Sequence, residues 1–74
     1  MNNKQELPKW DGLQMQEDGL IVENPITNEE YYLNEEELSM YNYILACQTV
    51  IEQYNEGISW FKANNHEAYM ALLN

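Results

Sequence analysis

The longest periodic pattern of apolar residues lies between Asn34 and Gly57. Apolar side chains recur there at steps of four, three, four and three residues, which is the spacing of one face of an α-helix. These residues are Met40, Ile44, Cys47, Ile51 and Tyr54. Asn34 with Glu37 three residues later is typical of a capping box at a helix start, and Gly57 is a favoured residue just beyond a helix end. The pattern predicts one central helix over residues 34–57, with Cys47 in its buried face.

The chain before this helix has the pattern of short strands and turns. Residues 20–22 (Leu-Ile-Val) and 30–33 (Glu-Tyr-Tyr-Leu) have the composition of strands, and residues 24–28 (Asn-Pro-Ile-Thr-Asn) between them are turn formers. Residues 13–16 alternate apolar and polar side chains, and the dipeptide Asp18-Gly19 that follows is a hairpin signal. The pattern predicts an antiparallel hairpin of two strands or a meander of three.

The chain after Gly57 predicts a short helical C-terminus. Ile58 to Ala63 form one short helical stretch, and Asn64 with Glu67 forms a second capping box before a last helix that ends at Leu73. One continuous helix from Ile58 is the alternative, because the apolar residues of both stretches also share one helical face.

Together these elements predict the α+β class: a short antiparallel β-hairpin or meander, a central α-helix and a short helical C-terminus. Residues 1–12 are mostly polar, and Pro8 and Gly12 interrupt regular structure, so we expect a flexible N-terminal arm. Trp10 in this arm is expected to pack back onto the core, and an anchor for a partner is the alternative. Residues 13–74 are expected to form a single small α+β domain.

The chain has more aromatic side chains than so small a core is expected to cover. It contains six tyrosines and two tryptophans, and these residue types often carry protein interfaces. A second apolar patch on the central helix (Leu38, Tyr41 and Leu45) predicts contact with two neighbours, or with one neighbour and another copy of the chain. The candidate interface residues are Trp60, Phe61, Tyr31, Tyr41 and Leu45.

Trp60 and Phe61 are the sharpest case for an interface. Adjacent side chains on a helix point about 100° apart, so one core does not easily cover both. Two interpretations stay open: both rings are half-buried against the central helix and the hairpin, or one of them faces another chain.

The charge of the chain is strongly negative. Thirteen acidic residues and three lysines give a net charge of −10, and residues 19–37 contain six glutamates and no basic residue. Three scattered lysines cannot form the basic patch that binding to nucleic acid requires. A solvated surface, a basic protein partner or imitation of a polyanion remains. The candidate acidic face consists of Glu29, Glu30, Glu35 and Glu36.

The sequence argues against an enzyme or a metal protein. One histidine and one cysteine, His66 and Cys47, lie 19 residues apart, so one chain does not supply a zinc site. A chain of 74 residues has few walls with which to desolvate its carboxylates, and tuning of a catalytic pKa needs burial. We therefore expect no catalytic residue, no cofactor and no metal.

Nothing in the sequence predicts contact with a membrane. No stretch approaches the ~18 apolar residues of a membrane span, and the first residues lack the apolar core of a signal peptide. A single cysteine also fits a reducing compartment. We expect a cytoplasmic protein.

Two motifs carry a resemblance to a known group of proteins. Asn-Pro-Ile-Thr-Asn at 24–28, followed by Tyr32-Leu33, precedes the ending Gly57-x-x-Trp60-Phe61…Ala68-Tyr69-x-x-Leu72-Leu73. This combination resembles small uncharacterised proteins of tailed bacteriophages, particularly marine ones, over roughly residues 20–73. Their turn has glycine where this chain has Asn28, and both residues accept a left-handed backbone. The resemblance implies a viral origin, and hence the cytoplasm of a host cell, without implying an activity.

Two functions follow as expectations. The first is a small acidic protein-binding module, not an enzyme, that associates with itself to a homo-oligomer. The alternative is an acidic mimic of nucleic acid that inhibits a nucleic-acid-binding protein of the host or the phage. Neither binds nucleic acid directly.

Overall fold

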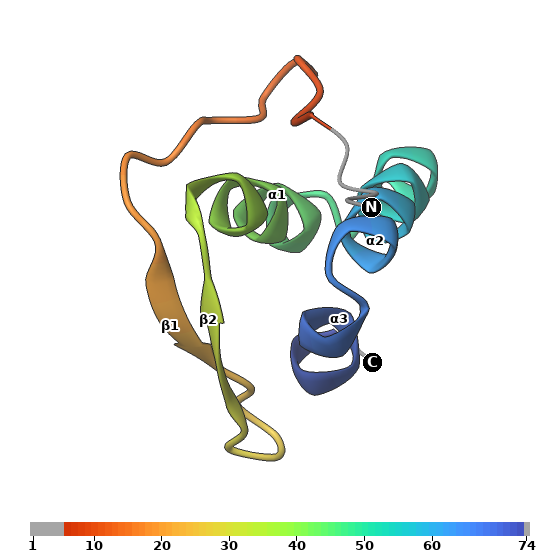
Figure 1. Cartoon of the computed structure of the whole chain (residues 1–74). Helices are drawn as coiled ribbons and strands as arrows, with labels where there is room; N and C mark the ends of the chain where they lie inside the picture. Colours follow the sequence, from red (N-terminus) through yellow and green to blue (C-terminus); the bar gives the residue numbers. More distant parts are fainter. Residues whose placement is uncertain (1–5, 74) are drawn as a thin grey trace.

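The computed structural model describes residues 6–73, and within this range the chain forms two strands and three helices (Figure 1). In order they are β1 (Leu20–Glu23), β2 (Glu30–Leu33), α1 (Glu35–Ala46), α2 (Ile51–Asn64) and α3 (His66–Leu72). The strands pair into a two-stranded antiparallel sheet, so the predicted α+β class is confirmed. Figure 1 shows β1 at the outer edge of the molecule, with β2 between it and the helices.

The turn between β1 and β2 is organised by Asn24. Its backbone N–H donates to the carbonyl of Glu29 at 2.8 Å, and its side-chain Oδ1 accepts from the N–H of Ile26 at 2.8 Å. Asn28 has a φ of 65°, a left-handed conformation that asparagine adopts more readily than most residues. The turn predicted for residues 24–28 is confirmed.

The register of the hairpin separates an inner face from an outer face. Val22 pairs with Tyr31 on the face that packs on the core, whereas Ile21 pairs with Tyr32 on the other face, where both side chains are exposed. Successive side chains of a strand point to opposite faces. Leu33 at the end of β2 is fully buried, which fixes this register against the helices.

Helix α1 begins with the predicted capping box. Asn34 Oδ1 accepts from the N–H of Glu37 at 2.8 Å, and Glu37 Oε1 accepts from the N–H of Asn34 at 3.1 Å. The other carboxylate oxygen of Glu37 accepts from Nδ2 of Asn65 at 3.0 Å. One buried carboxylate therefore joins the start of α1 to the bend between α2 and α3.

The central helix is shorter than predicted, because the chain bends between Cys47 and Val50. The N–H of Cys47 donates to two carbonyls of the last turn of α1, at 3.0 and 3.2 Å, and the next helix starts only at Ile51. The prediction of one helix over 34–57 is wrong. Thr49 and Val50 are β-branched, which lowers their helix propensity, and the bend folds α2 back against α1.

Gly57 also differs from its predicted role as the residue beyond a helix end. It lies inside α2, at the place where α2 meets α1. A Cβ atom at this position would lie 2.7 Å from Cγ1 of Ile44 and 3.5 Å from Sδ of Met40. The absence of a side chain at Gly57 is what lets the two helices approach this closely.

Residues 13–16 do not form the predicted strand, and Asp18-Gly19 precedes β1 without forming a hairpin turn; the bend lies at residues 17–18. The N–H of Gln16 donates to Oγ of Ser39 on α1 at 2.7 Å. This bond joins the segment to the helix, and the outer edge of β1 has no third strand from residues 13–16. Of the two alternatives for the sheet, two strands and not three are present in residues 6–73.

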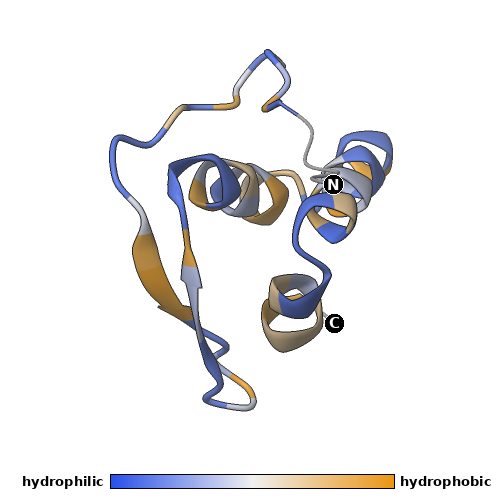
Figure 2. Cartoon of the chain, viewed as in Figure 1, coloured by the Kyte–Doolittle hydropathy of each residue, from blue (hydrophilic) through white to orange (hydrophobic). Residues whose placement is uncertain are grey.

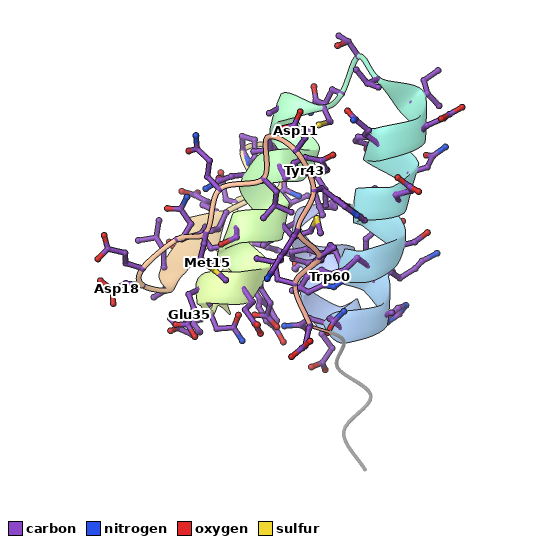
Figure 3. The ribbon with its side chains drawn as sticks, turned by 90° about the horizontal axis from the view of Figure 1, so that it is seen from above. Asp11, Met15, Asp18, Glu35, Tyr43 and Trp60 are labelled. Atoms are coloured by element: carbon purple, nitrogen blue, oxygen red, sulfur yellow. The ribbon has the colours of Figure 1, made fainter. Side chains whose placement is uncertain are left out.

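The N-terminal segment, residues 6–19, packs on the helices where the structure describes it. Figure 3 shows it lying over α1 and α2, with Trp60 beneath its first residues and Asp11 at its turn. The ring of Trp10 lies 5.4 Å from the ring of Tyr43, measured between centroids, so the expected packing of Trp10 on the core is confirmed. Residues 1–5 of the predicted flexible arm lie outside the described residues.

The boundary between α2 and α3 lies one residue later than predicted. Asn65, not Asn64, caps α3: its Oδ1 accepts from the N–H of Ala68 at 3.1 Å. Asn64 is the last residue of α2, and its Nδ2 donates to the carbonyl of Trp60 at 2.8 Å. The alternative of one continuous helix from Ile58 is excluded, because the backbone of Asn65 leaves helical geometry.

The core lies where both strands, α1, α2 and α3 meet. Its largest fully buried apolar side chains come from β2, α1 and α2. These are Leu33, Met40, Ile44 and Phe61. Figure 2 shows that β1 is strongly apolar although it lies at the outer edge, so the apolar residues of the chain are not all collected inside.

Candidate functional site

Three of the five predicted interface residues lie in the core of the single chain. Phe61 is fully buried and Trp60 is 6% exposed; Tyr41 is buried beside Phe61, with 6.3 Å between their ring centroids. Of the two interpretations of Trp60 and Phe61, the structure supports the one in which the chain covers both rings. The reason is that different elements cover them: α1 covers Phe61, and the N-terminal segment covers Trp60.

Tyr31 is half-buried on the inner face of the hairpin. Its hydroxyl donates to Oε1 of Glu67 on α3 at 3.2 Å. Burial raises the pKa of Tyr31 above its ordinary value of 10.0, and the negative charges of Glu67 and Glu37 raise this pKa further. This tyrosine ties β2 to α3 and is neutral near pH 7, so it acts as a structural donor.

Leu45 is the predicted interface residue that the structure places clearly on the surface. It is 43% exposed near the end of α1, and Val50 and Ile51, at the start of α2, are 47% and 71% exposed. We name these three residues the corner patch. The stretch from 38 to 51 contains no charged residue, although the exposed Glu52 follows it directly, so these three apolar side chains are exposed in an uncharged part of the chain where α1 turns into α2.

Val50 and Ile51 were not predicted to be exposed. A single straight helix would place Ile51 on the same face as Met40 and Ile44, and both of these are fully buried. The bend at residues 47–50 breaks this relation and turns Ile51 outward. The missed signal was Thr49-Val50, whose β-branching marks the break.

A second exposed apolar area lies on the outer face of the hairpin. Ile21 and Tyr32 are exposed there as a directly opposed pair. Next to them Glu23 is paired with Glu30, which puts two carboxylates side by side on the same face. Like charges opposite one another disfavour pairing, and this face differs in charge from the corner patch.

The structure divides the predicted acidic face into two groups. Glu29 and Glu30 lie at the turn end of the hairpin, and Glu35 and Glu36 lie in the first turn of α1, beyond the far end of β2. Glu36 is half-buried and the other three are exposed. The six glutamates of residues 19–37 therefore do not form one continuous surface.

The two residues considered for nucleophilic chemistry lie on different elements. Cys47 is half-buried at the bend after α1, with Sγ 3.7 Å from Oε1 of Gln53, and His66 is exposed at the start of α3 beside Tyr69. Cys47 is thus not the fully buried residue that was expected. Across residues 6–73 no group of three or more His, Cys, Asp and Glu side chains is arranged to hold a metal ion.

Two further findings bear on function. No helix in the described part of the chain has both the length and the apolar character needed to span a membrane. Comparison with protein-family models, with curated proteins and with solved structures finds no match for this chain. The exposed surfaces of the chain are therefore the features that indicate a function.

Proposed function

We propose that this chain is a small acidic protein-binding module, without enzymatic activity, that associates with a second copy of itself through the corner patch. The observation that carries the proposal is the exposure of Leu45, Val50 and Ile51 within residues 38–51, a stretch that contains no charged residue. Grouped apolar side chains on a small protein are typical of interaction sites.

The charge of the chain favours the corner patch over the hairpin face for self-association. Each copy carries a net charge of −10, so two copies repel each other wherever their carboxylates come close. Exposed charges are screened beyond about 8 Å at physiological ionic strength. Contact through residues 45–51 keeps the carboxylates of Glu23 and Glu30 away from the interface, whereas contact through the hairpin face would bring them together.

The oligomeric state of designed variants tests the proposal. Ile51→Glu adds a charge to the corner patch at the first residue of α2, where the helix dipole favours an acidic side chain, so the fold is retained. Ile26→Glu adds the same charge at the hairpin turn, where the side chain is 89% exposed, and is the matched control. Sedimentation velocity at micromolar concentration should show an oligomer for the wild type and for Ile26→Glu, and a monomer for Ile51→Glu.

A wild-type chain that sediments as a monomer contradicts self-association outright. Equal weakening of association by both variants would also contradict it, because net charge rather than the corner patch would then control assembly.

We also propose that the chain is phage-encoded and acts in the cytoplasm of a host cell. The support is the pair of motifs that resembles small proteins of tailed bacteriophages, together with the left-handed Asn28 at the position of their glycine. A gene for this chain between phage genes supports the origin, and a gene in a cellular operon without phage neighbours opposes it.

One observation favours a second function, imitation of nucleic acid. Glu23 and Glu30 are directly opposed at the turn end of the hairpin, and Glu29 follows the turn, so exposed carboxylates are concentrated there. Replacing Glu29, Glu30, Glu35 and Glu36 with glutamine should then abolish binding to a nucleic-acid-binding protein, and added salt should weaken the wild-type binding steeply. Binding that does not respond to salt would exclude this function.

A further inference from the structure

A groove of about 480 Å³ runs between the N-terminal segment and α2. Trp10, Trp60, Glu6 and Glu56 are among the residues that line it. Trp10 and Trp60 are the only tryptophans of the chain, and among the lining residues within the described range 6–73 there is no lysine. None of the lining residues belongs to the corner patch, so this groove is a separate site.

The two indole rings are held in place by contacts within the chain. Nε1 of Trp60 donates to the carbonyl of Glu6 at 3.1 Å, which fixes the N-terminal segment over α2. The ring of Trp10 packs at a tilt of 45° against the ring of Tyr43. The walls are therefore formed before any ligand binds, which lowers the entropic cost of binding.

The groove is negative as well as aromatic. Glu6 and Glu56 line it, and both are exposed. Burial is the main cause that raises the pKa of the neighbouring Tyr43 hydroxyl. The hydrogen bond with Cys47 and the negative charges of Glu56 and Asp11 raise this pKa further.

We propose that this groove binds the guanidinium group of an arginine side chain from a partner protein. Trp60 is only 6% exposed, so the half-buried ring of Trp10 offers the larger indole surface to the groove. The face of an indole ring attracts a cation. A planar guanidinium stacks on such a face and donates hydrogen bonds to carboxylates at the same time, which an ammonium group does less well. The net charge of −10 attracts a basic partner from a distance.

Tryptophan fluorescence tests the site directly, because both emitting residues line the groove. The full chain is titrated with N-acetyl-arginine amide at constant ionic strength, and in parallel with N-acetyl-citrulline amide, which has the same shape but no charge. The arginine compound should give a saturable change with a dissociation constant in the millimolar range, and the citrulline compound should bind much more weakly.

Two double variants separate the groove from the overall charge. Glu6→Gln/Glu56→Gln should weaken binding roughly tenfold, as expected for the loss of two exposed ion pairs. Both substitutions leave the backbone carbonyl of Glu6 in place for Trp60. Glu29→Gln/Glu52→Gln changes the net charge equally at exposed positions outside the groove and should bind as the wild type does.

Several outcomes would overturn the proposal. They are the absence of a saturable change, equal binding of the citrulline compound, and equal weakening in both double variants. A fluorescence change that disappears on dilution together with the oligomer would mean that a second copy of the chain, and not a partner's arginine, occupies the groove. Because the readout is ligand binding, failure here leaves the test of self-association through the corner patch unaffected.

Discussion

Two regions at opposite sides of the molecule are built from different interactions. Where the hairpin, α1 and α3 meet, side-chain hydrogen bonds join the elements: Glu37 to Asn65, Tyr31 to Glu67, and Asn24 Nδ2 to the carbonyl of Ala71 at 2.9 Å. We call this region the junction. On the other side lies the bend between α1 and α2 (Figures 1 and 3). The apolar side chains of the corner patch are exposed there.

The junction maintains the fold, whereas the corner patch is open to a partner. Hydrogen bonds are directional, so the junction fixes the positions of β2, α1 and α3 relative to one another. Apolar contact is not directional and scales with the area covered. The corner patch therefore contributes little to the stability of the free chain. Covering it with a second surface removes apolar area from water and lowers the free energy.

The largest expected effect is at Glu37. Glu37→Ala removes the acceptor for both the N–H of Asn34 and Nδ2 of Asn65, and it should lower the free energy of unfolding by about 2–3 kcal/mol. Glu35→Ala, in the same turn of α1 but exposed, should cost only about 0.3–1 kcal/mol. Urea unfolding followed by circular dichroism measures both, and equal losses would show that the junction is not anchored by Glu37.

The next effect is at Gly57, between the two regions. Alanine has a helix propensity about 1 kcal/mol better than glycine, but its Cβ atom would collide with Ile44 on α1, and overpacking costs about 1–3 kcal/mol. Gly57→Ala should therefore destabilise the chain by up to about 2 kcal/mol in thermal or urea unfolding. Ser59→Ala, exposed on the same helix, is the control and should be neutral within about 0.5 kcal/mol. A gain in stability for Gly57→Ala would mean that α1 and α2 do not approach as described.

The next expected effect is a loss of stability in alkaline solution, and one tyrosine in each region contributes to it. Tyr31 lies at the junction and Tyr43 on the side of the corner patch, and burial is the first cause that raises the pKa of each above 10.0. The unfolded chain then releases protons first, so stability is fully present below about pH 10 and is lost as the pH rises through the folded pKa values. Tyr31→Phe and Tyr43→Phe should each reduce this loss. Urea unfolding at a series of alkaline pH values measures the slope, and stability that does not change with pH would contradict the prediction.

The smallest expected effect on folding is at the corner patch. At concentrations where the chain is monomeric, Ile51→Ser should change the free energy of unfolding by less than about 0.5 kcal/mol, because this side chain is 71% exposed. Leu45→Ser should cost about 1 kcal/mol, because this side chain is 43% exposed and the rest of it is covered. At micromolar concentration the same substitutions should weaken self-association. A large loss of stability in the dilute chain would show that these residues belong to the core rather than to an interface.

Local features of the chain were predictable because their causes lie within a few residues. Asn34 and Glu37 form the capping box, and Asn28 takes the left-handed conformation in the turn, since both depend on side chains that reach their own backbone. Of the candidate interface, Leu45 could be predicted because it lies outside the main apolar stripe of the helix.

Other features depended on segments that are distant in the sequence. The periodicity from Met40 to Tyr54 is compatible with one straight helix or with two helices folded together, and only the approach of α1 to Gly57 distinguishes them. Likewise, residues 13–16 have the alternation of a strand, but the N–H of Gln16 donates its hydrogen bond to Oγ of Ser39 on α1 and not to a carbonyl of β1. The exposure of Ile51 follows from the bend between α1 and α2, and the groove between Trp10 and Trp60 follows from the path of the N-terminal segment over the helices.

The sequence by itself therefore determined the α+β class, the hairpin turn, the start of α1 and the excess of negative charge, because each results from local backbone preference or from composition. The tertiary structure alone decided which apolar side chains are covered. Burial depends on the neighbour that each side chain meets, and neither Phe61 against Tyr41 nor Trp60 under Glu6 is a neighbour that periodicity can specify.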